Sequence, residues 1–235
     1  MWQANVFTIF PEAFPGNLGV SLVKKALDHG RWSLSLIDLK NFPAKSDRID
    51  STPYSGGNGM ILSPITFEKA FDSLPEKEKS WRKIYFSPRG RKLNQADLQE
   101  IANEDGIIML CGRYEGVDQR ILDYYEMEEV SVGDFVLAGG EVAAMVIVEG
   151  CVRLLPGVLG KNESIDEDSF QKFLLEYNQY TKPSIFKGQK VPDVLLSGNH
   201  TDIEEFKSEE SKRLTMIHNP DLWAKYIQKS LLDVF

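Results

Sequence analysis

The sequence predicts an α/β fold, built on a mainly parallel sheet with helices on both faces and followed by a small helical region. Strand-like apolar runs alternate with helix-like segments over residues 1–160, the pattern of parallel strands joined by crossover helices. The composition then changes, because residues 161–168 are polar and acid-rich while residues 169–235 carry helix signals. We therefore expect an α/β domain at 1–160, a linker at 161–168 and a helical domain at 169–235.

The first elements are a strand, a helix and a second strand. Val6–Phe10 is a short apolar run that stops at Pro11, which cannot continue a central strand. Val20–His29 has apolar residues at helical spacing, and Gly30 suits the position just after a helix C-terminus. Leu34–Leu39 has strand character. The chain is therefore expected to begin with a β-α-β pattern.

A polar, proline-punctuated segment lies between residues 41 and 64. Its three glycines, Gly56, Gly57 and Gly59, indicate either a sharp turn or a loop that admits a ligand. The segment contains neither the Gly-Lys-Ser/Thr of a phosphate-binding loop nor the Gly-x-Gly-x-x-Gly of a dinucleotide-binding fold. The residues alone leave both interpretations open.

The later elements continue the alternation. The predicted strands are Ile84–Ser87, Ile107–Cys111 and a run beginning at Val132. The predicted helices are Thr66–Leu74, a helix through Leu98 and Ile101 with Asn94 as its N-cap, Asp118–Tyr125 and Val142–Leu155. In the C-terminal region, Thr201–Glu204 has the spacing of a capping box, and Asn219-Pro220 suits an N-cap followed by proline.

Three glycine-bearing loops follow predicted strands: Ser87–Gly90, Gly112–Gly116 and Val132–Gly140. Ligands of parallel α/β sheets bind at the carboxyl ends of the strands. Glycine lets backbone approach a ligand closely, because it has no Cβ. The three loops together predict the wall of a small-molecule site.

Charge and composition limit the classes of partner. The formal net charge is −8, with 35 acidic against 27 basic residues, which argues against indiscriminate nucleic-acid binding. Two basic patches still allow a specific RNA partner, although either could be a solvated surface: Arg82, Lys83, Arg89, Arg91 and Lys92, and Lys182, Lys187 and Lys190. No apolar run is long enough to span a bilayer, and Cys111 and Cys151 are too few for a disulfide framework. We expect a cytoplasmic protein.

The residues suited to chemistry are acids and bases rather than nucleophiles. His29, His200 and His218 are not at metal-ligand spacing, and no Gly-x-Ser-x-Gly motif is present. The acid-base candidates are Arg113, Glu115, Asp118, Asp134, Glu141, Arg153 and Asp168. Residue chemistry alone therefore predicts an α/β enzyme with a glycine-walled cosubstrate site.

A series of motifs narrows this prediction. They are Pro53-Tyr54 with Gly56, Gly57, Gly59 and Met60; Ser87-Pro88 with Gly90–Leu93; Cys111–Gly116; Gly133-Asp134 with Val136-Leu137 and Gly139–Glu141; Arg153 with Pro156–Gly160; Asp168–Phe170; Tyr180-Thr181; and Leu195–His200. In these motifs, over nearly its whole length, the chain resembles the bacterial tRNA (guanine-37-N1)-methyltransferases, a family of the SPOUT class of trefoil-knotted methyltransferases.

The resemblance implies a deep trefoil knot in the C-terminal part of the α/β domain and a homodimer whose active site lies at the subunit interface. It also implies that residues 1–160 bind S-adenosylmethionine and that residues 169–235 bind tRNA. The cofactor-binding residues implied are Tyr85, Phe86, Ser87, Pro88, Gly90, Gly112, Arg113, Tyr114, Glu115, Gly116, Val132, Gly133, Asp134, Phe135, Val136, Leu137, Gly139 and Gly140.

The same resemblance implies a reaction at guanine N1 with two catalytic residues. Asp168 matches the aspartate that acts as general base, and Arg153 matches the arginine that stabilises charge on O6. Glu115 is a further candidate for cofactor or metal contacts, and Mg²⁺ is a second candidate cofactor. The chain departs from the family pattern at Ser55 and Asn58, within residues 45–52, at Arg89 in place of glutamine, and at Phe135 in place of tyrosine.

Two alternatives stay open on the sequence. A SPOUT ribose 2′-O-methyltransferase would use the same cofactor but lack the pairing of Arg153 with Asp168 and this C-terminal domain. A non-catalytic RNA-binding protein of the same fold would have no reason to keep either catalytic candidate.

Overall fold

The computed structural model describes residues 1–44, 47–54, 56, 59–159 and 169–232. The chain forms two compact units, residues 1–160 and residues 161–235. The expected linker at 161–168 lies outside the described residues.

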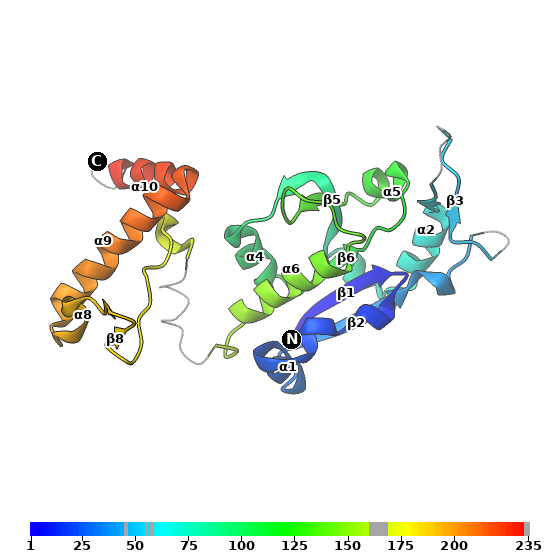
Figure 1. The fold of residues 1–235 in the computed structure, drawn as a ribbon. Helices are drawn as coiled ribbons and strands as arrows, with labels where there is room; N and C mark the ends of the chain where they lie inside the picture. Colours follow the sequence, from blue (N-terminus) through cyan, green and yellow to red (C-terminus); the bar gives the residue numbers. More distant parts are fainter. Residues whose placement is uncertain (45–46, 55, 57–58, 160–168, 233–235) are drawn as a thin grey trace. The chain divides into compact units, whose positions relative to one another are not determined.

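The first unit is built on a five-stranded sheet in the order β2-β1-β6-β5-β7 (Figure 1). Its strands are β1 (Trp2–Thr8), β2 (Trp32–Asp38), β5 (Arg82–Lys92), β6 (Gly106–Leu110) and β7 (Glu128–Ser131). Every neighbouring pair is parallel, so the predicted parallel sheet is confirmed. The carboxyl ends of β6, β5 and β7 consequently lie side by side at one edge.

Helices pack on both faces of this sheet. Helices α1 (Ser21–Asp28), α4 (Gln95–Ala102) and α6 (Glu141–Leu154) contribute to one apolar cluster, and α2 (Pro64–Asp72) and α5 (Gln119–Tyr124) to another. Successive side chains of a strand point to opposite faces, so Val6 enters the first cluster and Phe7 the second. Each side chain of this size that is fully buried contributes roughly 1.5–3 kcal/mol.

Shorter elements complete the unit. They are the 3₁₀ helices η1 (Pro11–Ala13), η2 (Gly16–Gly19) and η3 (Leu39–Asn41), the antiparallel pair β3 (Asp50–Ser51) and β4 (Ile61–Leu62), and α3 (Glu76–Lys79). No helix in the described ranges is long and apolar enough to cross a membrane.

Two helix-end predictions are confirmed. Gly30 follows α1 with φ +64°, a left-handed conformation that glycine adopts without strain. Asn94 caps α4, because its side chain accepts hydrogen bonds from the N–H groups of Ala96 and Asp97, and Asp97 bonds back to the N–H of Asn94. Both signals are local, which explains why they could be recognised in the sequence.

Two strand predictions were wrong in detail. The strand predicted at Ile84–Ser87 does not end there, because β5 resumes pairing after a bulge and both Phe86 and Arg91 lie opposite Val130. Residues 87–90 therefore protrude from a continuing strand. The run beginning at Val132 is loop, since β7 ends at Ser131.

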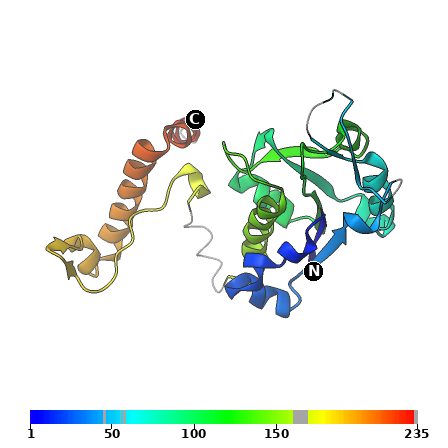
Figure 2. The same cartoon turned by 45° about the vertical axis from the view of Figure 1, so that its right-hand side comes forward.

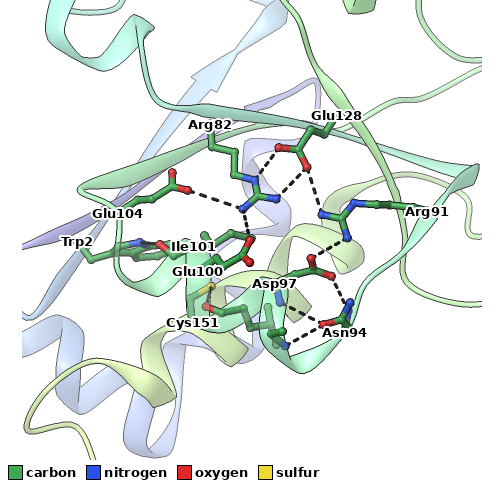
Figure 3. A network of polar contacts seen from close by, with 12 residues as sticks. Trp2, Arg82, Arg91, Asn94, Asp97, Glu100, Ile101, Glu104, Glu128 and Cys151 are labelled. Atoms are coloured by element: carbon green, nitrogen blue, oxygen red, sulfur yellow. Dashed lines mark hydrogen bonds and ion pairs between the residues drawn. The ribbon is translucent and has the colours of Figure 1, made fainter. Parts of the chain in front are cut away.

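Ion pairs connect the two arms of β5 to β7 and α4 (Figure 3). The guanidinium of Arg82 donates two hydrogen bonds to Glu128, at 2.7 and 2.9 Å, and Arg91 contacts Glu128 at 3.3 Å and Asp97 at 2.7 Å. Burial alone would raise the pKa of Asp97, but hydrogen bonds from Arg91 and the N–H of Asn94 outweigh it and lower that pKa. The protruding residues 87–90 are thus anchored at their base.

The second unit is less helical than predicted. Its helices are α8 (Asp193–Leu196), α9 (His200–His218) and α10 (Pro220–Leu232), preceded by η4 (Gln171–Phe173) and a hairpin of β8 (Ile185–Phe186) and β9 (Gln189–Lys190) (Figure 2). Pro183 and the positive φ of Gly188, +82°, favour a turn over a helix in this stretch.

Of the two helix N-caps predicted in the second unit, one is confirmed and one was wrong. Asn219 caps α10, accepting a hydrogen bond from the N–H of Leu222 at 3.1 Å. The predicted capping box at Thr201–Glu204 was wrong, because α9 starts at His200, two residues earlier than a Thr201 N-cap would require. Its N-cap is Asn199, whose side chain accepts from the N–H of Thr201 at 3.1 Å.

Candidate active site

The three glycine-bearing loops meet on one cavity of about 250 Å³ at the carboxyl edge of the sheet. One loop protrudes from β5, one follows β6, and one follows β7, and these three strands are neighbours. The lining residues are Tyr85, Phe86, Ser87, Pro88, Gly112, Arg113, Tyr114, Glu115, Gly116, Val130, Ser131, Val132, Gly133, Phe135, Val136, Leu137, Ala138, Gly139, Gly140 and Ala143. The geometry expected from parallel strands is thus the one observed.

Close packing explains the glycines of the wall. A Cβ on Gly112 would lie 2.8 Å from the ring of Tyr85, and one on Gly140 would lie 2.8 Å from Cα of Cys111. Gly116 has φ +120°, which side chains rarely permit. Any larger residue at these positions would push into the cavity wall or displace its backbone.

A buried ion pair fixes the loop after β6 to the start of α6. Arg113 donates to the carboxylate of Glu141, with its Nη2 atom at 2.9 Å, and to the carbonyl of Ala138 at 3.1 Å. The same carboxylate accepts a hydrogen bond from the hydroxyl of Thr8 at 2.8 Å. Glu141 is 3% exposed, so its charge depends on these partners and on the helix N-terminus beside it. Arg113 is thereby held in the cavity wall, with its guanidinium 4.5 Å from the ring centre of Phe10.

The rim of the cavity is apolar and exposed. Phe135, Val136 and Leu137 follow one another along the third loop, and Val136 is 82% exposed. Tyr114 lies exposed on the second loop and has φ +60°. Burial raises the pKa of the Tyr85 hydroxyl and holds the pKa of the Cys111 thiol well above its usual range. The walls therefore offer apolar surface and backbone polar groups more than ionisable side chains.

The family of the protein follows from its relatives. The sequence model of the family described as "tRNA (Guanine-1)-methyltransferase TrmD" matches residues 2–225. The chain belongs to this family. A tRNA (guanine-N(1)-)-methyltransferase of Cereibacter sphaeroides strain KD131 is 47% identical over 230 residues, covering 96% of this chain and 92% of that protein. The proteins of that name from Ruegeria sp. TM1040 and Ehrlichia ruminantium strain Gardel are 47% and 46% identical, covering 96% and 94% of the chain and 93% and 95% of their own lengths.

Most residues that the family resemblance assigns to the cofactor line the cavity, and two do not. Gly90 lies at the base of its loop, where a Cβ would meet the backbone of Glu129 and Val130 at about 2.5 Å. Asp134 points its carboxylate to Lys92. Four lining residues were missed: Val130, Ser131, Ala138 and Ala143. Val130 and Ser131 immediately precede the predicted loop Val132–Gly140 and would have been found by extending it two residues, whereas Ala138 lies inside that loop and Ala143 lies in α6.

The glycine segment before α2 adjoins the second loop. The N–H of Glu115 donates to the carbonyl of Met60 at 3.1 Å, and the N–H of Leu62 donates to the carbonyl of Gly116 at 3.1 Å. A Cβ on Gly59 would overlap the side chain of Glu115. Glycine at position 59 therefore allows this segment to pack closely against the loop Gly112–Gly116. Ser55, Gly57 and Asn58 lie outside the described residues.

The two predicted catalytic residues are not part of the cavity wall. Arg153 lies in the last turn of α6 and is partly exposed, away from the lining residues. Asp168 lies outside the described residues. The carboxylate that lines the cavity on an exposed loop is that of Glu115. In the part of the chain that the structure describes, no three His, Cys, Asp or Glu side chains are grouped to hold a metal ion.

Proposed function

We propose that the protein transfers a methyl group from S-adenosylmethionine to N1 of guanine 37 of tRNA. The observation that carries this proposal is the match to tRNA (guanine-N1)-methyltransferases over almost the whole chain, combined with the cavity at the edge of the sheet. The position of the guanine and the residue roles below are parts of the same proposal. We also place the protein in the cytoplasm, where tRNA would meet it.

The cavity suits S-adenosylmethionine in its chemistry. Backbone groups near Ser87, Gly112 and Val132–Leu137 would bind the adenine and ribose, and the apolar rim would cover the adenine. Arg113, held by Glu141, keeps the second loop in one conformation. When bound, the cofactor supplies an electrophilic methyl group on a sulfonium. The glycine wall lets the chain approach it closely.

Asp168 would act as the general base. Guanine N1 carries a proton at neutral pH, so its lone pair is not available to attack a methyl group. If the pKa of N1 lies about two units above neutral, removing the proton costs roughly 3 kcal/mol. Taking that proton moves negative charge onto O6, where the guanidinium of Arg153 would stabilise it. Arg153 belongs to the last turn of α6, a rigid element that begins at the cavity wall.

The cavity would be completed by a second copy of the chain. Val142 and Val146 are exposed on α6, close in sequence to the exposed rim residues Val136 and Leu137. Such contiguous apolar residues favour an interface. In the proposed homodimer, the segment carrying Asp168 in one subunit would reach the cavity of its partner. We also propose that the second and third loops form the trefoil knot, since a Cβ on Gly140 would touch the backbone of Cys111.

The second unit would bind tRNA. Lys182, Lys187 and Lys190 lie on or beside the β8–β9 hairpin and form no ion pair with a described carboxylate. Phe186 is exposed at the same hairpin, where it could stack on a base. Mg²⁺ would have to bind through one carboxylate, such as that of Glu115, together with the RNA, and no catalytic step is assigned to it.

The test is to map the methylated atom. The protein is incubated with labelled S-adenosylmethionine and a tRNA transcript that has guanine at position 37, with a guanine-to-adenine transcript as control. The proposal predicts label on N1 of guanine 37 and none on the control. Label on a ribose 2′ oxygen would support a ribose methyltransferase instead, and binding without any label would support a non-catalytic RNA-binding protein.

A further inference from the structure

The basic surfaces of the first unit differ in how far carboxylates neutralise them. The patch at residues 82–92 was a candidate RNA surface in the sequence, but most of its cations are paired. Arg82 binds Glu128, Arg89 binds Glu129, Arg91 binds Asp97 and Lys92 binds Asp134. These contacts use the cations to fasten β5 to its neighbours. A polyanion would have to displace the carboxylates to bind there.

A second group of basic side chains gathers around a hollow that the sequence did not suggest. Lys25, His29 and Arg31 line a hollow of about 540 Å³ between the end of α1, the turn before β2 and the chain after α6. All three are exposed, and none forms an ion pair with a carboxylate of the described residues. By contrast, these arginines do: Arg48, Arg82, Arg89, Arg91, Arg113, Arg120 and Arg213.

The backbone beneath this group is held firmly. The N–H of Arg31 donates to the carbonyl of Ala26 at 2.9 Å, and the carbonyl of Arg31 accepts from the N–H of Trp2 at 3.3 Å. The guanidinium lies against the turn after α6, since a Cβ on Gly157 would be 3.4 Å from Nη2 of Arg31. These side chains are therefore presented from a rigid base.

Among the described residues, the carboxylates nearby do not pair with these side chains. Asp28, on the same helix, is occupied by Lys24. Glu104 and Asp105 lie with Arg31 on a neighbouring hollow, but Glu104 pairs with Arg82 and neither is within ion-pair distance of Arg31. The last carbonyls of α1 accept the N–H groups of His29, Gly30 and Arg31, which reduces the negative field of the helix end.

We propose that Lys25, His29 and Arg31 bind phosphate groups of the tRNA backbone. This inference rests on the proposed function, which makes a polyanion the substrate of a chain whose net charge is −8. Unpaired cations on such a chain provide the local attraction that its overall charge does not. The hollow includes Gly157 and Val158, which follow α6, the helix whose last turn carries Arg153.

The experiment compares a double variant of the hollow with a single substitution on α1 as control. The variant Lys25→Gln with Arg31→Gln is measured against Lys24→Gln, which removes a neighbouring charge that is already paired with Asp28. Equilibrium binding of the guanine-37 transcript is recorded from 0.05 to 0.3 M salt. The double variant should bind roughly tenfold more weakly, with the slope of log K against log salt reduced by about one for each lost phosphate contact. Lys24→Gln should behave like wild type.

Two controls separate this inference from the proposed function. Affinity for S-adenosylmethionine and the thermal unfolding midpoint should be unchanged in the double variant, which excludes a folding defect. The inference would be overturned if the double variant kept the wild-type tRNA affinity and salt slope. It would also be overturned if Lys24→Gln lost as much tRNA affinity as the double variant, or if the wild-type protein did not bind tRNA. Failure of wild-type protein to label N1 of guanine 37 while it binds tRNA would overturn the proposed function alone.

Discussion

The two units of the protein bury very different residues. The first unit contains fully buried apolar side chains on both faces of its sheet, such as Phe7, Ile84 and Ile107. Among the described residues of the second unit, the buried side chains are Ser211 and Thr215, and large apolar residues are exposed, such as Phe186, Ile217 and Leu231. The first unit therefore carries a hydrophobic core and the cavity, whereas no apolar side chain among the described residues of the second unit is fully buried. Under the proposed function, tRNA and a second subunit would cover these exposed apolar residues.

The largest effect is expected on the rate of methyl transfer when the proposed base is removed, while cofactor binding by the cavity is unchanged. Asp168→Asn should lower the rate of methyl transfer by about 10²- to 10⁴-fold, because the proton on guanine N1 loses its acceptor. Affinity for S-adenosylmethionine should stay at the wild-type value, since the cavity belongs to the first unit. Single-turnover methylation and equilibrium cofactor binding measure the two quantities. A wild-type rate in the variant would show that another group is the base.

The next largest effect is expected on the free energy of unfolding when the Arg113–Glu141 ion pair of the cavity wall is broken. Arg113→Met should destabilise the first unit by about 3 kcal/mol or more, because Glu141 keeps a buried charge without its cation. Adding Glu141→Gln should recover part of that loss. Denaturant unfolding of the two variants measures the difference. A loss below about 1 kcal/mol for Arg113→Met would mean that Glu141 does not need its partner.

A matched pair of substitutions tests the contrast in burial. Ile107→Ala removes a fully buried side chain of β6 and should cost about 2–5 kcal/mol. Ile227→Ala shortens a side chain of α10 that is 40% exposed and should cost about 0.5 kcal/mol or less in unfolding. Equal losses would contradict the difference in burial between the described residues of the two units.

The smallest effect is a change in acid stability. Arg91 lowers the pKa of Asp97, and a carboxyl with a depressed pKa contributes stability that is present above its unfolded pKa and lost as the pH falls through its folded pKa. Arg91→Gln should cost about 1 kcal/mol or less at neutral pH, and that difference from wild type should shrink below about pH 4. Unfolding measured from pH 7 to pH 3 tests this, and a constant difference would contradict it.

The sequence predicted the parallel sheet and the three loops because their signals are local. An apolar run followed by glycine or proline marks a strand end, and parallel strands bring such ends together. The continuation of β5 beyond residues 87–90 could not be predicted, since it depends on Val130 of a distant strand pairing on both sides of the bulge.

Charge on the surface was the least predictable feature. The run from Arg82 to Lys92 is prominent in the sequence, but its carboxylate partners come from α4, β7 and the loop after β7. Lys25, His29 and Arg31 do not stand out, and become a group only because the end of α1 meets the turn after α6. Pairing between charges is a tertiary property, so neither outcome follows from spacing.

The central claim is that one subunit supplies the cavity and its partner supplies the base. Two inactive chains test it when co-expressed with different tags and purified as the mixed dimer. One is Asp168→Asn, and the other is Gly112→Leu, whose side chain would meet the ring of Tyr85 in the cavity wall and obstruct cofactor binding. The account predicts that the mixed dimer regains about half of the wild-type methylation rate, because one of its two composite sites is intact. A mixed dimer as inactive as its two parents would contradict it.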